Sequence, residues 1–151
     1  MAESWHSIWL RWRFNWFPAY RATGGRIRYV AADFSEVRVE LGLNRRTRNY
    51  HGTIFGGSMY GALDPIHAIM LIQRLGPDYR VWVKSARVEF LKPGRGMLHA
   101  TCRIPDGECD RLRGLLQETI SVEPSYEAEL NDAQGTPHAR ITVTLHIRRA
   151  G

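Results

Sequence analysis

The sequence predicts an α+β domain in which a strongly curved antiparallel sheet wraps around one long apolar helix. Residues 37–43 and 139–147 alternate apolar with polar side chains, which is typical of strands with one buried face. Residues 56–75 instead place apolar side chains at helical spacing. Because this helix is too apolar to lie in solvent, we expect the sheet to enclose it.

The other elements are expected in order along the chain. They are a helix over 5–17, a weaker strand over 26–34, a strand over 80–91, its partner strand over 98–104, a short helix from 105 to 116 and a strand over 119–130. Pro65 is expected to kink the central helix, and Gly76-Pro77 to end it. The even-numbered side chains of the strand over 80–91 are expected on one face; they include Trp82, Ala86, Val88 and Phe90.

Length and composition predict one globular domain over residues 1–151, with residues 1–20 as a Trp-rich helical extension. Apolar residues make up 44% and charged residues 24%, as in an ordinary globular protein. The sequence has no run of about 18 apolar residues, so no membrane-spanning helix is expected. The two cysteines, Cys102 and Cys109, form no CxxC motif. Their spacing argues against a disulfide framework and a thiolate zinc site, and favours a reducing compartment, the cytoplasm.

The net charge of +6 comes mainly from arginine, since Lys84 and Lys92 are the only lysines among 21 basic residues. Arginine favours bidentate contacts with carboxylate or phosphate. The excess indicates either a basic surface or a polyanionic partner: a nucleic acid, an anionic membrane or coenzyme A. The arginines are scattered, without finger spacing or a recognition-helix pattern, which disfavours nucleic acid.

The N-terminal helix carries two apolar strips. Four tryptophans recur at steps of four, three and four; they are Trp5, Trp9, Trp12 and Trp16. Leu10, Phe14 and Phe17 form the second strip, and Arg11 and Arg13 argue against a secretory signal. We favour a tryptophan stripe packed over the domain or across a dimer interface. The alternative is peripheral contact with an anionic membrane. Pro18 is expected to end this helix.

Residues 49–64 carry the strongest indication of chemistry. Gly56-Gly57 open the central helix, where free backbone N–H groups attract an oxyanion. Asp64 follows Gly57 by seven residues, about two helical turns, and a carboxylate in so apolar a helix is costly to bury. Spacing alone leaves open a catalytic pair or a structural carboxylate beside a tight turn.

These residues resemble a known motif. Asn49, Phe55-Gly56-Gly57 and Asp64 are similar to the motif of PaaI-like acyl-CoA thioesterases, which have the hotdog fold. Asp64-Pro65 and the segments 90–96 and 144–149 resemble the DUF4442 family of the same superfamily. The similarity extends over nearly the whole chain.

The resemblance implies two subunits that share one continuous sheet, as a homodimer or a dimer of dimers, with active sites between subunits. Asp64 would be the general base or nucleophile, the Gly57 N–H would polarise the thioester carbonyl, and Asn49 would orient the water or the thioester. Further substrate-binding positions are His51, Thr53, Phe55, Gly56, Ser58, Lys92 and Arg95. The substrate would be an acyl-CoA or acyl-carrier thioester, with no metal or cofactor. Oxyanion stabilisation and a carboxylate base suit this hydrolysis.

Phe55 stands where PaaI-like enzymes have a histidine. This difference favours, as an alternative, a non-catalytic acyl- or CoA-binding protein, with or without membrane association. It also disfavours a hotdog dehydratase, which needs that histidine. His51 is a candidate replacement, and His67 lies three residues after Asp64, where a helix brings side chains together. Phosphate-binding candidates also include Arg45, Arg46 and Arg48.

Overall fold

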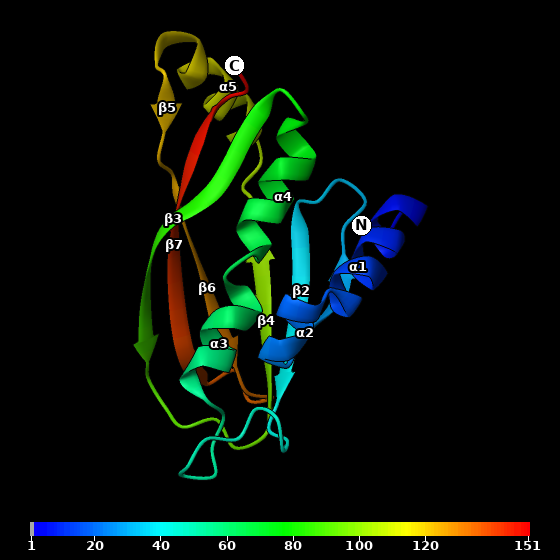
Figure 1. Cartoon of the computed structure of the whole chain (residues 1–151), viewed down its shortest axis with the longest axis vertical. Coiled ribbons are helices and arrows are strands. Elements are labelled where there is room, and N and C mark those ends of the chain that lie inside the picture. Colours follow the sequence, from blue (N-terminus) through cyan, green and yellow to red (C-terminus); the bar gives the residue numbers. More distant parts are fainter. Residues whose placement is uncertain (1) are drawn as a thin grey trace.

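An antiparallel sheet curves around two consecutive helices in the computed structural model, which describes residues 2–151 (Figure 1). The strands, in sheet order, are β1 (Gly25–Val30), β2 (Glu36–Gly42), β4 (Met97–Arg103), β6 (Ser125–Asn131), β7 (Pro137–Arg149) and β3 (Tyr79–Phe90). The short β5 (Ser121–Val122) pairs with β7. The helices are α1 (Trp5–Trp16), α2 (Pro18–Thr23), α3 (Gly56–Leu63), α4 (Ile66–Leu75) and α5 (Glu108–Glu118). The predicted α+β architecture is therefore confirmed.

The central helix is divided more completely than predicted. We expected one kinked helix over 56–75, but α3 ends before Asp64 and α4 begins after Pro65. Proline has no N–H to donate to the preceding turn, and its ring clashes with the carbonyl four residues earlier. As a result, Asp64 lies at a break between two helices.

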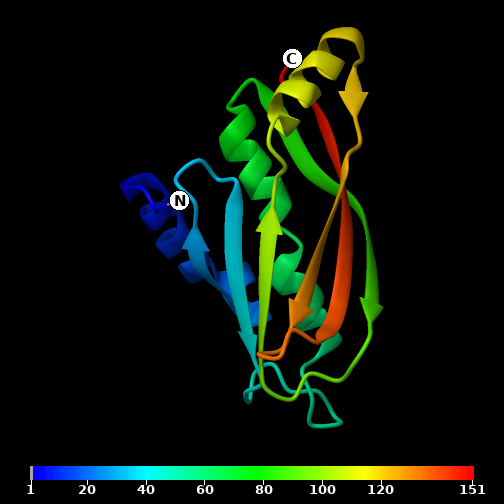
Figure 2. The ribbon, with the colours of Figure 1, turned by 180° about the vertical axis from the view of Figure 1, so that it is seen from behind.

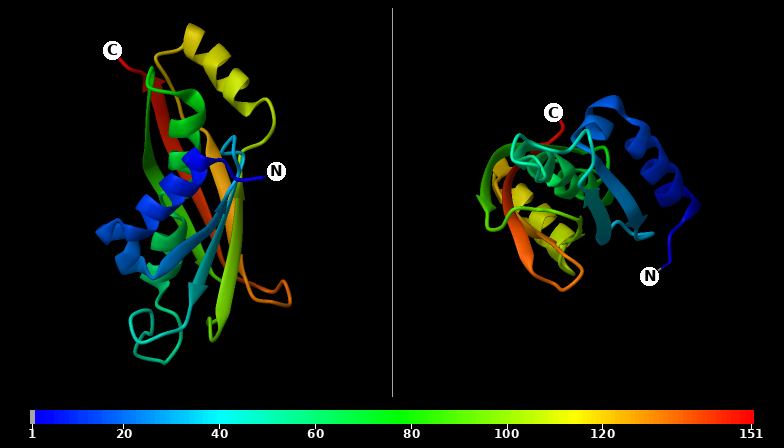
Figure 3. Two further views of the ribbon diagram at one scale, coloured as in Figure 1. Left: turned by 90° about the vertical axis from the view of Figure 1, so that its right-hand side faces the viewer. Right: turned by 90° about the horizontal axis from the view of Figure 1, so that it is seen from below.

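The buried sides of α3 and α4 and the concave face of the sheet form the core. The sheet encloses these helices, as the views from behind, from the side and from below show (Figures 2 and 3). Met70 and Leu71 of α4 are fully buried, as are Leu98 of β4 and Leu145 of β7. Each large aliphatic side chain buried in this way contributes about 1.5–3 kcal/mol. Cys102 is also fully buried, and burial raises the pKa of its thiol to about 12.

Two expectations about the strand over 80–91 are wrong. It does not pair with the strand that follows, because β3 pairs with β7 at one edge of the sheet whereas β4 lies between β2 and β6. The turn over 92–96 is therefore a crossover. Trp82 also lies on the face opposite to Ala86, Val88 and Phe90, because the register of β3 against β7 shifts between Val83 and Ser85. An extra residue in one strand reverses the parity beyond it.

The strand predicted over 119–130 is interrupted. Helix α5 continues to Glu118, and the predicted range is covered by two separate strands, β5 and β6. Pro124 separates the two strands, since proline cannot donate a ladder hydrogen bond.

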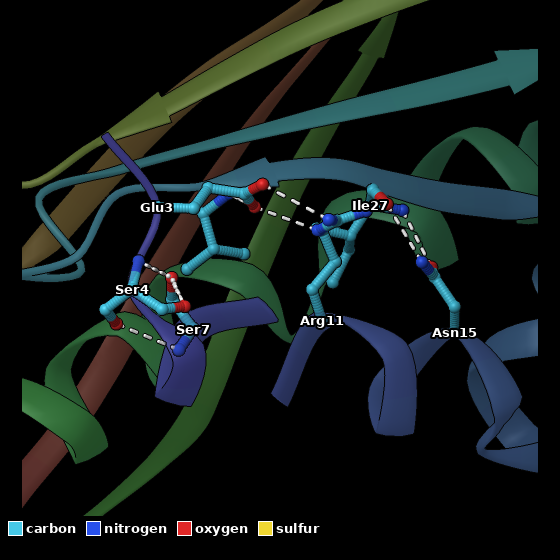
Figure 4. A network of polar contacts seen from close by, with 7 residues as sticks. Glu3, Ser4, Ser7, Arg11, Asn15 and Ile27 are labelled. Atoms are coloured by element: carbon cyan, nitrogen blue, oxygen red, sulfur yellow. Dashed lines mark hydrogen bonds and ion pairs between the residues drawn. The ribbon is translucent and has the colours of Figure 1, made fainter. Parts of the chain in front are cut away.

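Helix α1 covers the outer edge of β1 through polar contacts (Figure 4). The Asn15 side chain accepts from the Ile27 N–H and donates to the Ile27 carbonyl, both at 2.8 Å, in the manner of a neighbouring strand. Glu3 binds Arg11 at 2.8 and 3.1 Å and accepts from the Val30 N–H at 3.0 Å. Ser4 and Ser7 cap the start of the helix reciprocally.

The tryptophans of α1 do not pack over the domain. Leu10 and Phe14 contact the core, whereas the four indoles of the stripe face outward. The first form of the favoured expectation, in which the stripe packs over its own domain, is therefore wrong, whereas packing across a dimer interface stays a prediction. Pro18 does end α1, but it also begins α2, where a residue without an N–H is well tolerated.

We predict that Asn15→Ala lowers the free energy of unfolding by about 2 kcal/mol, because it leaves the N–H and carbonyl of buried Ile27 without partners. Urea denaturation measures this change. Gln134→Ala, which removes an exposed amide in the β6–β7 turn, is the control. Equal stability of the two variants would show that Asn15 does not anchor α1.

Candidate active site

The loop between β2 and α3 is held by its own side chains. The Asn49 Oδ1 accepts from the N–H groups of His51 and Thr53 at 2.9 and 3.0 Å, and its Nδ2 donates to the Thr53 hydroxyl at 2.9 Å. The Phe55 N–H then bonds the Thr47 carbonyl at 2.7 Å. Asn49 thus fixes the loop that leads into α3. This structural role was not expected, since the family resemblance implied for Asn49 only the orientation of the water or the thioester.

Two aromatic rings lie against the glycines at the start of α3. A Cβ added to Gly56 would lie 2.9 Å from the ring of Phe90, and one added to Gly57 would lie 2.3 Å from the ring of Phe55. Within residues 2–151, no hydrogen bond uses the N–H of Gly56 or Gly57. The helix therefore presents two free N–H donors, as predicted, at the positive end of its dipole.

A hollow of about 300 Å³ opens beside this helix start. It lies between the loop, the first turn of α3 and the crossover after β3. Its lining is Asn49, Thr53, Ile54, Gly56, Met59, Phe90, Leu91, Lys92 and Pro93. The Ile54 N–H donates to the Gly94 carbonyl at 2.9 Å, which joins the loop to the crossover. Apolar walls, a backbone donor and one lysine suit a ligand with an apolar body and an anionic group.

Asp64 does not line this hollow. It lies seven residues beyond Gly57, about 10 Å along the helix. Its carboxylate is half-buried and accepts a hydrogen bond from the Tyr60 hydroxyl. Burial first, and the Asp64 bond second, raise the pKa of Tyr60 to about 12, so Tyr60 remains a donor at neutral pH.

Of the other predicted positions, Thr53, Gly56 and Lys92 join Asn49 at the hollow. Ser58 is buried within α3, while His51, Phe55, Gly57 and Arg95 are exposed outside the hollow's lining. Sequence reasoning missed Tyr60 and Phe90. Tyr60 could have been found, since it precedes Asp64 by four residues on one helix. Phe90 could not, because its approach to Gly56 depends on how β3 and α3 pack.

His67 does not pair with Asp64. Its ring stacks on Tyr126 at 5.3 Å, and its Nε2 has no hydrogen-bond partner within the described part of the chain. The Tyr126 hydroxyl donates instead to Glu108 at 2.6 Å, and Arg111 binds the same carboxylate. Burial lowers the pKa of His67 to about 4, so it is a neutral core residue.

The strand order, the antiparallel pairing and the enclosed helices define a hotdog fold, the fold of a large class of thioesterases. Other solved structures share it, including the following three. A Pseudomonas aeruginosa protein described as a probable thioesterase has 18% identity and a TM-score of 0.83, with 99% of each chain covered. A Haemophilus influenzae thioesterase has 13% identity and a TM-score of 0.73, with 97% of this chain and 93% of that chain covered.

The third is the Escherichia coli PaaI protein of the phenylacetic acid degradation operon. It has 17% identity and a TM-score of 0.65, with 97% of this chain and 95% of that chain covered. At these identities the likeness establishes the fold. No functionally curated protein matches the sequence. Residues 9–147 match the model of DUF4442, a domain of unknown function, and the chain belongs to this family.

We predict that His67 makes stability fall as the pH drops below about 6.5. The unfolded chain binds a proton near pH 6.5 but the folded chain only near pH 4, so protonation favours unfolding in this window. Between pH 7.5 and 5 the free energy of unfolding should lose about 2 kcal/mol through this residue. Denaturation of His67→Phe at both pH values should show that loss removed.

The exposed His51→Phe serves as the control and should keep the wild-type pH dependence. An unchanged pH dependence in His67→Phe would contradict the assignment.

Proposed function

We propose that this protein is a homodimeric thioesterase that hydrolyses an acyl-CoA or acyl-carrier thioester. The observation that carries the proposal is the largely apolar hollow at the start of α3, which Gly56 lines and beside which the N–H groups of Gly56 and the next residue, Gly57, are free. A thioester carbonyl bound there would place its oxygen at these donors, which stabilise the negative charge that develops during attack.

The carboxylate is supplied across a subunit interface in this proposal. Asp64 lies outside its own chain's hollow, so one chain does not hold donors and base together. Strand β3 is the uncovered edge of the sheet, and Phe90 at its end is 59% exposed. Edge strands of this length usually have a partner or a cover. Pairing of two β3 strands would extend the sheet and bring a second α3 towards the hollow.

The reaction follows from these groups. The partner subunit's Asp64 takes a proton from water, and the water oxygen forms a bond to the thioester carbon. The carbonyl oxygen becomes negative while the Gly57 N–H donates to it. Collapse then breaks the carbon–sulfur bond, and the departing thiolate takes up a proton to give a carboxylic acid and a thiol. Tyr60 holds Asp64 in one orientation. Lys92, at the rim, suits a phosphate of coenzyme A.

We predict that Asp64→Asn lowers kcat for acyl-CoA hydrolysis by about 10²–10⁴-fold with little change in acyl-CoA affinity, because the amide cannot accept the water proton. Release of free thiol from a panel of acyl-CoAs measures kcat. Asp78→Asn, at the exposed α4–β3 turn, is the matched control and should keep wild-type activity. Undiminished turnover by Asp64→Asn would refute the role of Asp64.

The same panel of acyl-CoAs distinguishes the thioesterase from the second candidate function, a non-catalytic acyl-binding protein. Phe55 favours this candidate, because its ring, and not a polar side chain, lies against Gly57. If calorimetry shows that the wild type binds acyl-CoA but no thiol is released, binding without turnover is the function.

The dimer carries a prediction of its own. Ala86 is exposed on β3, and Ala86→Glu should place like charges in the paired edge and convert the dimer to a 17.4 kDa monomer with strongly reduced hydrolysis. Light scattering coupled to gel filtration measures the mass. Ala133→Glu, in the exposed β6–β7 turn, is the control. A wild type that is monomeric yet active would contradict the shared site.

A further inference from the structure

The outward face of α1 is aromatic where a surface helix is ordinarily polar. Four side chains, Trp5, Trp9, Trp12 and Trp16, occupy an arc of about 60° on the helix. Their exposed fractions are between 50% and 89%. Phe17, just beyond the end of the helix, stacks on Phe14 and is also exposed. The four tryptophans are called the aromatic stripe below.

The orientation of this stripe is fixed by the opposite side of the helix. Leu10 and Phe14 pack on the core, and Asn15 and Arg11 are held by the contacts to β1 and Glu3 (Figure 4). The helix therefore cannot turn its indoles inward without breaking these contacts. Contiguous apolar surface of this kind marks an interaction site.

The charge around the stripe is mainly positive. Residues 3–33 contain five arginines, and their acidic residues are Glu3 and Asp33. Glu3 pairs with Arg11, which leaves Arg13 and Arg21 beside the indoles without an ion pair among the described residues. The guanidinium of Arg13 lies 5.0 Å from the ring centre of Trp9, and that of Arg21 lies 4.7 Å from the ring centre of Trp16. Arginines that lie along aromatic rings can keep their charge near water while the rings enter an apolar phase.

Two hollows flank the helix. One, of about 310 Å³, adjoins Trp16 and is lined by Arg21, Arg26 and Arg46, none of which forms an ion pair with another described residue. Its size and charge suit a phosphate headgroup. The other, of about 290 Å³, is an apolar groove between α1 and α4, lined in part by Phe17 and Ile72. A hollow lined by arginines and an apolar groove thus both adjoin the tryptophans of α1.

We propose that α1 binds the surface of an anionic lipid bilayer, with the aromatic stripe in the interfacial layer and Arg21, Arg26 and Arg46 against lipid phosphates. Tryptophan favours this layer, and basic residues near it are attracted by anionic lipids. No helix within residues 2–151 is long and apolar enough to cross a bilayer, so the contact is peripheral. The proposal does not depend on thioesterase activity.

A second copy of the chain fits the stripe less well. Pairing two stripes about a twofold axis would bring Arg13 and Arg21 of each copy close to the same arginines of the other, while Glu3, the acidic residue next to α1 in the sequence, is already paired with Arg11. An anionic surface supplies the opposite charge.

Co-sedimentation of the full chain with vesicles tests the proposal. We expect partitioning at least about tenfold stronger onto phosphatidylcholine mixed with phosphatidylglycerol than onto phosphatidylcholine alone, and weaker binding at higher salt. Trp9→Ala/Trp12→Ala should weaken it by at least about tenfold. Arg21→Glu/Arg46→Glu should weaken it by about 25-fold or more, from roughly fivefold per arginine.

Matched variants at distant edges act as controls: Trp82→Ala removes an exposed indole of β3, and Arg148→Glu/Arg149→Glu reverses two exposed charges of β7. Both should retain wild-type partitioning. The proposal is overturned if the wild type does not sediment with the mixed vesicles, or if the variants of α1 bind as strongly as the controls. It is also overturned if Trp9→Ala/Trp12→Ala only changes the mass in light scattering, since the stripe would then be a subunit interface.

Discussion

Enclosure of the apolar sides of α3 and α4 by one curved sheet is the constraint on which the remaining structure depends. The helices carry too many buried aliphatic side chains to lie on a surface, so strands must cover them on more than one side. A sheet that curves around a helix pair without closing has two free edges. The strand order gives these edges to β1 and β3.

The two edges are treated differently. At β1, Asn15 of α1 and Glu3, which precedes α1, substitute for strand partners, so backbone groups of Ile27 and Val30 are bonded. At β3, within the described chain, no element covers the outer side. The same difference separates the two regions of interest: the aromatic stripe lies outside the covered edge, and the proposed thioester site lies beside the uncovered one.

The sequence predicted what depends on local pattern and failed where distant segments decide. Alternation located β2 and β7, and the glycine pair located the start of α3, because side-chain periodicity and backbone freedom are local properties. The predicted partner of β3 was wrong, since nothing in the turn over 92–96 indicates that β3 pairs with the distant strand β7. The predicted face of Trp82 was wrong because the register shift after Val83 cannot be recognised from the alternation of apolar and polar residues.

The same division applies to the candidate site. Residue types predicted free donors at Gly56 and Gly57, and Asn49 and Lys92 do meet at the adjoining hollow. The sequence could not show that Asp64 lies outside that hollow, because its place depends on the break at Pro65 and on packing across an interface. His67 had suitable helical spacing for Asp64, but the stacking partner Tyr126 comes from a distant strand.

The anchoring of α1 has a thermodynamic consequence. Many surface-active helices are unfolded in water and must order their backbone as they bind, at a cost of about 1–2 kcal/mol per residue. In this protein the capping pair Ser4 and Ser7 and the bonds of Asn15 already hold the helix in its final form. The free energy of its association with a surface would therefore contain little folding entropy, and circular dichroism should register almost no gain of helix on binding.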